Sequence, residues 1–302
     1  MDIRVIVNQV FILFLAMGVG FVANKTGIIN AEVNKKLSEL LLKIVSPFLV
    51  ITSFSIEFSR EMLINAVIVF TVAFAAHVIS AILAYFVLLK FKEDEKKVYK
   101  YSMVFSNCAF MGFPVLESLF GKNGIFYGSI YLVTFTIFMW TYGVMLFTEC
   151  KDLKTIKKAM KTPGIISVLI GMVIFVFQIK LPVPIYKTLE MIGSMNTPIA
   201  MLVIGNLLAG IDFKKAFVGK GMYLAVTMRI LVVPIAAILI MKLVGLTGDV
   251  LGACSALVAM PVAANTAIFA EMYDCNAPLA SRCVAISTLM SIFTIPLVIA
   301  IL

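Results

Sequence analysis

The sequence predicts an all-α membrane protein with ten transmembrane helices in two inverted repeats of five, residues 1–150 and 151–302. Hydrophobic residues make up 62% of the 302-residue chain, and charged residues only 14%. The mean hydropathy is +1.08, and long apolar runs recur from one end of the chain to the other. This composition excludes an ordinary soluble domain and leaves no room for a second, soluble one.

Apolar runs of about 20 residues, the length that crosses a bilayer, divide the chain into ten predicted spans. The first run lacks the basic start, short apolar core and small-residue cleavage site of a signal peptide, so we expect it to be retained. The ten runs cover residues 5–23, 37–56, 62–89, 101–120, 124–148, 163–179, 184–210, 216–243, 248–272 and 278–302.

Two of these spans, the fourth and the ninth, contain a proline near their middle, Pro114 and Pro261. Proline removes a backbone donor and clashes with the carbonyl four residues earlier, so the fourth span should stop at Phe113 and restart at Pro114. In lipid, unpaired backbone groups are tolerated only where they face protein or a water-filled cavity. Two broken spans at corresponding positions of two halves therefore point to the binding site of a secondary transporter.

Three pairs of distinctive residues are separated by about half the chain, which indicates an internal repeat. The separations are 151 residues for Pro47 and Pro198, 147 for Pro114 and Pro261, and 152 for His77 and Arg229. Each half would hold five spans, an odd number, so the second copy must cross the membrane in the opposite direction.

Lysine and arginine are distributed unevenly over the predicted loops. The loops after odd-numbered spans hold 17 of them, many in residues 90–100 and 149–162, and the opposite side holds six. Because these residues set the orientation of short loops, the richer side should be cytoplasmic, with both termini outside the plasma (inner) membrane. The net charge of +9 then reflects topology and contact with anionic lipid, and requires no nucleic acid.

The two breaks are the candidate binding site. Half-helices that start at Pro114 and Pro261 would present unpaired N–H groups and positive dipole ends, and two such ends meeting in the membrane favour an anion. Asn107 lies about two turns before one break and Asn265 one turn after the other. Each can donate to a carboxylate or to a freed carbonyl. A purely structural role for these asparagines remains an alternative.

Pro47 and Pro198 should kink the spans opposite the breaks, so that Asn196 and Thr197 line the same cavity. A kink without a binding role is an equal alternative. The five cysteines form no C-x-x-C pair, and we expect them to pack as small apolar residues.

Charged residues inside spans are scarce, and this singles out Arg229 in the eighth span and His77, the only histidine, in the third. A guanidinium in hydrocarbon costs about 2.5 to 3.5 kcal/mol, so Arg229 should face the protein interior and bind carbonyls or asparagine. Beside it His77 should stay neutral at pH 7 and take up a proton only when an anion or a rearranged core offsets Arg229. Both residues could instead only satisfy broken backbone.

The motif Asn107-x-x-Phe110-x-Gly112-Phe113-Pro114, then Phe120-Gly121, and Met260-Pro261-x-Ala263 with Asn265, resembles the auxin efflux carrier family over essentially the whole chain. That family includes bacterial transporters proposed to carry malonate or other small carboxylates, and the PIN auxin carriers of plants. The resemblance implies a fold like the bile acid symporter and the NhaA antiporter. Spans 4 and 9 would cross at their breaks, spans 1, 2, 6 and 7 would form a scaffold, and the others a moving core.

The resulting candidate set joins the residues of the breaks, the scaffold kinks and the two intramembrane charges. The substrate-binding candidates are Asn107, Gly112, Pro114, Pro261, Asn265, Pro47, Asn196 and Thr197, and the coupling candidates are His77 and Arg229.

The function that fits these features is secondary transport of small organic anions by alternating access, with an elevator-like movement. The alternative, a cation or proton antiporter of the same fold, normally needs acidic residues at the crossing, and residues 102–116 and 251–270 contain none. A membrane hydrolase lacks support, because there is no G-x-S-x-G or H-E-x-x-H motif.

We expect no enzyme activity, metal or cofactor. Proton or sodium coupling and the direction of transport stay open, as does a homodimer through the scaffold helices.

The orientation predicts the accessibility of the loop at residues 149–162. A cysteine introduced at Thr155, in a background without reactive native cysteines, should not react with a membrane-impermeant maleimide in intact cells, because 17 basic residues hold that side in the cytoplasm. It should react once the membrane is permeabilised. Efficient labelling in intact cells would reverse the orientation.

Overall fold

The computed structural model describes residues 3–148, 160–210 and 219–301, and within these ranges all regular elements are helices. The predicted all-α class is therefore confirmed for the described part of the chain. Cys150 and most of the basic loop 149–162 lie outside the described residues, as do Lys214 and Lys215.

The first half of the chain begins with α1, and several of its helices are joined through a π-helical turn. Asn30 starts α2 by accepting a hydrogen bond from the Val33 N–H. Gly121, with φ of 55°, divides α6 into two helical segments, because only glycine adopts this conformation without strain. The elements are α1 Ile3–Lys25, α2 Ala31–Leu40, a π turn Leu41–Val45, α3 Ser46–Ser53, α4 Arg60–Val87, α5 Glu93–Val104, a π turn Cys108–Gly112, α6 Phe113–Phe138, a π turn Met139–Gly143 and α7 Val144–Thr148.

The second half also contains both short and long helices. Asn276 starts the last helix by accepting from the Leu279 N–H. The elements are α9 Pro163–Phe177, α10 Val183–Gly193, α11 Asn196–Ala209, α13 Lys220–Thr227, a π turn Met228–Val232, α14 Val233–Leu243, α15 Gly248–Ala259, α16 Asn265–Met272 and α17 Ala277–Ile299.

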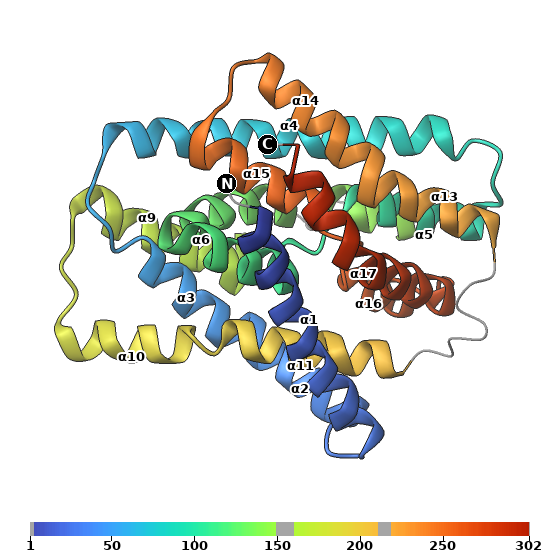
Figure 1. Cartoon of the computed structure of the whole chain (residues 1–302), viewed down its shortest axis with the longest axis horizontal. Coiled ribbons are helices and arrows are strands. Elements are labelled where there is room, and N and C mark those ends of the chain that lie inside the picture. Colours follow the sequence, from blue (N-terminus) through green and yellow to red (C-terminus); the bar gives the residue numbers. More distant parts are fainter. Residues whose placement is uncertain (1–2, 149–159, 211–218, 302) are drawn as a thin grey trace.

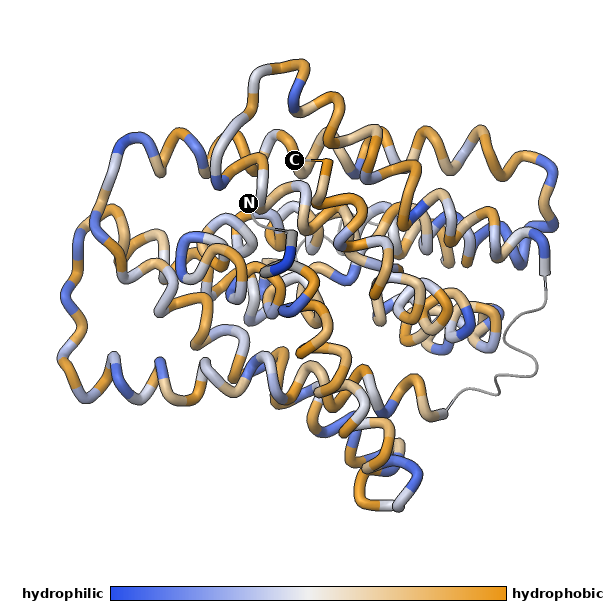
Figure 2. Tube along the Cα trace, in the orientation of Figure 1, coloured by the Kyte–Doolittle hydropathy of each residue, from blue (hydrophilic) through white to orange (hydrophobic). Residues whose placement is uncertain are grey.

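Six helical stretches of the described residues are long and apolar enough to cross a membrane, and two shorter apolar helices accompany them. Large apolar side chains on their outer faces are exposed, for example Phe11 at 54% and Phe293 at 78%. Figure 2 shows hydrophilic residues gathered mainly at helix ends and turns. Exposed apolar faces of this extent are typical of contact with lipid, so the chain is a multi-pass membrane protein. The six stretches are 7–25, 60–87, 108–148, 183–209, 220–243 and 277–299.

The helices are arranged around a buried centre. In Figure 1, α4 runs along one long edge of the molecule and α10 with α11 along the opposite edge. Helix α1 packs along α11, and α3 packs against α9 and α10. The interrupted pair α5–α6 and α15–α16 lies between these edges, and it contributes many fully buried side chains, among them Tyr101, Phe113 and Phe126.

Candidate functional site

The two interruptions meet and pair through their main chains. Asn107 N–H donates to the Pro261 carbonyl at 2.8 Å, and Ala263 N–H donates to the Phe105 carbonyl at 3.0 Å. Ser106 and Val262 form an isolated antiparallel bridge between these two bonds. The extended segments thus satisfy each other, as buried backbone in a membrane requires.

The first interruption does not lie where Pro114 predicted it. Helix α5 ends at Val104 and the next helical turn begins at Cys108, so the break precedes Pro114 by two turns. Pro114 occupies the first turn of α6, where its missing N–H costs little. The π turn before it lets both Met111 and Gly112 N–H groups bond to the Asn107 carbonyl. The predicted restart at Pro114 is therefore wrong.

The second break contains its proline, but helix α16 restarts at Asn265 and not at Pro261. Asn107 and Asn265 consequently occupy equivalent places: each stands where the second half of a broken span begins. The predicted positions, two turns before one break and one turn after the other, are corrected accordingly. Both asparagines lie at the end of a half-helix that carries unpaired N–H groups.

Arg229 binds the carboxyl ends of the two helices, α5 and α15, that lead into the breaks. We call the place where the two breaks meet the crossing. Its side chain is 2% exposed and extends from the π turn Met228–Val232. Nη1 donates to the carbonyls of Met103 at 3.2 Å and Val104 at 3.3 Å, at the carboxyl end of α5. Nη2 donates to the Val258 carbonyl, at the carboxyl end of α15. One guanidinium therefore compensates two negative helix ends, which leaves the two positive helix ends as the polar face of the crossing.

A cavity of about 50 Å³ lies against that face. Its crossing side is formed by Asn107, Ala264 and Ala267. Helix α17 supplies a second wall and α11 an apolar third wall. The lining residues from these two helices are Ser281, Val284, Ala285 and Thr288 of α17, and Ile204, Leu207 and Leu208 of α11. Among the described residues, no acidic side chain lines this cavity.

Asn107 is the polar side chain of the crossing that enters the cavity without a partner. It is 3% exposed, and its Nδ2 has no hydrogen-bond partner among the described residues. Asn265 is half-buried and its Nδ2 donates to Met139 Sδ at 3.3 Å, a weak acceptor. Gly112 packs against α15, where an added Cβ would meet Leu257 Cδ2 at 2.7 Å. Gly112 therefore allows close packing and does not line the cavity.

The residues predicted on the opposite spans do not line this cavity. Asn196 is fully buried and its Oδ1 accepts from Ser46 Oγ at 2.7 Å, next to Pro47. Thr197 Oγ1 donates to Glu117 Oε2 at 2.8 Å and so links α11 to α6. The π turn before Pro47 places that proline in the first turn of α3, as the turn before α6 does for Pro114. The helix faces seen in the structure thus place Pro47, Asn196 and Thr197 in helix packing and helix–helix contacts.

His77 lies in an aromatic enclosure next to the crossing. Its ring is 1% exposed and stacks on Phe138 with centroids 5.1 Å apart, with Tyr131 and Phe105 at 5.5 Å and 6.0 Å. His77 Nδ1 donates to the Ala73 carbonyl at 2.7 Å, so Nε2 is a free acceptor among the described residues. His77 and Arg229 both lie beside the carboxyl end of α5 and are close enough to interact electrostatically. No hydrogen bond joins them in the described part of the chain.

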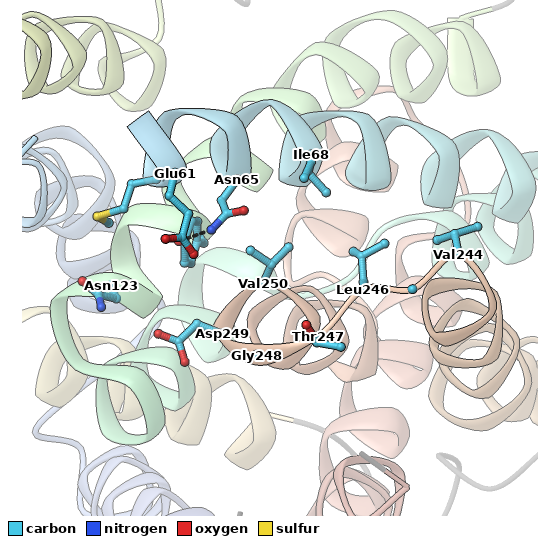
Figure 3. Close-up of a pocket in the computed structure, with 13 residues that line it drawn as sticks. Glu61, Asn65, Ile68, Asn123, Val244, Leu246, Thr247, Gly248, Asp249 and Val250 are labelled. Carbon is cyan, nitrogen blue, oxygen red and sulfur yellow. Dashed lines mark hydrogen bonds between the residues drawn. The ribbon is translucent and has the colours of Figure 1, made fainter. Parts of the chain in front are cut away.

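A larger cavity, of about 500 Å³, lies at the other end of α15 from the break (Figure 3). Glu61 and Asn65 on α4 face Asp249 at the start of α15, and Asn65 Nδ2 donates to Tyr127 Oη at 3.3 Å. Two carboxylates at its wall disfavour an anion. The cavity at the crossing differs from it, because donors line that cavity and no carboxylate of the described residues does.

The sequence reasoning missed the walls that α11 and α17 contribute. The α11 residues Ile204, Leu207 and Leu208 resemble the other apolar residues of the spans, so only the fold could show that they line the cavity. On α17 the polar residues Ser281 and Thr288 are seven positions apart and lie on one face of the helix, a signal that was present in the sequence.

Two interrupted helices that cross inside a multi-pass helical protein, beside a cavity with unpaired donors, define a membrane transport protein. The chain belongs to the family described as Membrane transport protein, whose sequence model matches residues 5–156 and 151–299. This confirms the resemblance to auxin efflux carriers.

Two relatives are similar over nearly their full length. An uncharacterized transporter of Methanocaldococcus jannaschii is 24% identical over 300 residues, which cover 96% of each chain. An uncharacterized transporter of Methanothermobacter thermautotrophicus is 23% identical over 283 residues, which cover 92% of each chain.

The contacts of Arg229 predict its role in stability. Arg229→Met keeps a long apolar stem and leaves the three carbonyls without a donor, each costing about 1 to 3 kcal/mol. We expect a clear fall in the melting temperature of the purified protein in detergent. Lys43→Met, which removes an exposed charge that pairs with Glu39 at 3.7 Å, should change it little. Equal melting temperatures for Arg229→Met and wild type would contradict this role.

Proposed function

We propose that this protein is a secondary transporter that moves small organic anions across the plasma membrane by alternating access. The observation that carries the proposal is the polarity of the crossing. Arg229 compensates the carboxyl ends of the broken helices, and the positive amino ends remain beside a cavity that no acidic side chain lines in the described part of the chain. The family and its relatives are transporters, so the site is assigned to binding and not to catalysis.

The proposed membrane arrangement has ten spans in two inverted halves, residues 1–150 and 151–302, with both termini outside. The helix order supports it: each half holds one interrupted span, α5–α6 in the first and α15–α16 in the second. The interrupted spans meet as two antiparallel segments, which is how copies related by a two-fold axis in the membrane plane would meet.

The size of the cavity supports an elevator-like movement. A volume of about 50 Å³ holds a water molecule or one carboxylate group, not a whole organic anion. Substrate binding therefore requires the apolar wall of α11 to separate from the crossing. In this proposal spans 1, 2, 6 and 7 form the scaffold, to which α11 belongs, and the remaining spans move as the core. A homodimer would form through the scaffold helices, within the lipid bilayer.

Coupling is proposed to run through His77 and Arg229. The free acceptor of His77 is Nε2, and protonation there adds a second positive charge near Arg229. An anion at the crossing would offset that charge, which would link protonation to occupancy. The charged and titratable groups near His77 are Tyr131 of α6 and Arg229. Sodium coupling and coupling-free transport are the alternatives that the assay below separates.

The function is tested with purified protein in proteoliposomes. Uptake of radiolabelled mono- and dicarboxylates is measured at several pH values, with and without sodium, against empty liposomes and a cation panel. Saturable carboxylate transport supports the proposal. Transport of cations with no carboxylate transport would favour the antiporter alternative and reject it.

Asn107 provides a test of the site. Asn107→Ala removes a donor to a charged ligand and should weaken binding of the best carboxylate by about tenfold or more. Asn107→Asp should be weaker still, because it places a negative charge against the anion. Asn123→Ala, in the larger cavity, is the matched control and should bind as wild type does. Tighter binding by the Asp variant than by the Ala variant would show that the site does not select anions.

His77 provides a test of coupling. His77→Gln keeps hydrogen bonding but cannot titrate, so the pH dependence of transport between pH 5 and 8 should flatten. If transport by His77→Gln keeps the wild-type pH profile, the coupling role is rejected, and His77 has only a structural role as part of the aromatic enclosure.

A further inference from the structure

Helix α17 carries two buried threonine hydroxyls, those of Thr288 and Thr294, that depart from the pattern of the buried serines on the same helix. Ser287 Oγ donates to the Val284 carbonyl at 2.9 Å, and Ser291 Oγ donates to the Thr288 carbonyl at 2.6 Å. Buried hydroxyls in apolar helices usually donate in this way to a carbonyl three or four residues earlier. Thr288 Oγ1 is fully buried and has no hydrogen-bond partner among the described residues.

Thr288 faces the cavity at the crossing. Residues 281, 284, 285 and 288 share one face of α17, and all four line that cavity. The adjacent Ser287 accepts the Val262 N–H at 3.1 Å, which fixes this turn of α17 at the depth of the second break. Of the buried side chains without partners in the described ranges, Asn107 and Thr288 are the two that line this cavity.

The unpaired groups around the cavity are mainly donors. Asn107 offers its amide N–H groups and Thr288 its hydroxyl. The backbone N–H groups of Ala264 and Asn265, at the start of α16, have no acceptor among the described residues. Leaving buried polar groups unpaired is costly, so a ligand with several acceptor atoms is the expected occupant. A carboxylate has two oxygens and about four acceptor positions, and it fits the available volume.

We propose that Thr288 is a further substrate-binding residue, whose hydroxyl donates to the substrate carboxylate from the side of α17. Asn107 and the amino end of α16 contact the same group from the crossing. The apolar body of the substrate then lies toward Ile204, Leu207 and Leu208 of α11. This inference rests on the proposed transport of organic anions and adds a residue that selects for the head group.

The experiment compares three variants of the full-length protein on α17. Thr288→Val removes the hydroxyl and keeps the shape, and Thr288→Ser keeps the hydroxyl. Thr294→Val is the matched control, because Thr294 is another buried hydroxyl without a partner on α17 that does not line the cavity. Equilibrium binding is measured in detergent with radiolabelled acetate, butyrate, benzoate and malonate, and melting temperatures check that each variant is folded.

We expect Thr288→Val to bind the preferred carboxylate about 10- to 100-fold more weakly than wild type, since a hydrogen bond to a charged group is lost. Thr288→Ser should stay within about threefold of wild type, and Thr294→Val should be unchanged. Wild-type affinity in Thr288→Val, or an equal loss in Thr294→Val, would overturn the role of Thr288 while the proposed function stands. A wild-type protein that binds none of the four carboxylates would overturn the proposed function, and this inference with it.

Discussion

The main-chain pairing between the two interruptions is the contact on which the centre of the molecule depends. A helix can be broken inside a bilayer only if its freed backbone groups find partners. Here each break supplies partners to the other, through Asn107 with Pro261 and Ala263 with Phe105. Arg229 then satisfies the carbonyls that this pairing does not reach. The groups left over are donors at the amino ends of the half-helices, and this is the observation from which we propose an anion as the ligand.

The sequence predicted the class of fold because hydropathy and broken spans follow directly from composition and proline. It misplaced the first break because proline is tolerated in the first turn of a helix as well as at an interruption. The structure shows Pro114 in the former situation and Pro261 in the latter. The polar pair Ser106-Asn107 was the better marker of the first break, since polar side chains at a break lie beside freed backbone groups.

The contacts of Arg229 were predictable in kind, because the cost of a buried charge requires carbonyl partners, but the identity of the partners depends on the crossing. The position of Asn196 away from this cavity was not predictable, for a related reason. The rotation of α11 about its axis puts the Asn196 side chain against Ser46 and leaves Ile204, Leu207 and Leu208 toward the cavity. Helix rotation is set by packing against neighbouring helices, and a single sequence does not determine it.

The two walls of the cavity differ in a way that bears on movement. The crossing is held by main-chain bonds and by one guanidinium, so its parts must move together if they move at all. The wall from α11 contributes only apolar side chains there, which can separate from the crossing without breaking a hydrogen bond. Farther along α11, Thr197 bonds to Glu117 of α6, and Lys122 contacts Glu190 of α10 at 3.5 Å. These partly exposed polar contacts can exchange their partners for water at small cost, whereas the buried pairs of the crossing cannot. In the proposed elevator-like transport, these are therefore the polar contacts that would exchange when the crossing moves against α10 and α11 and the cavity opens.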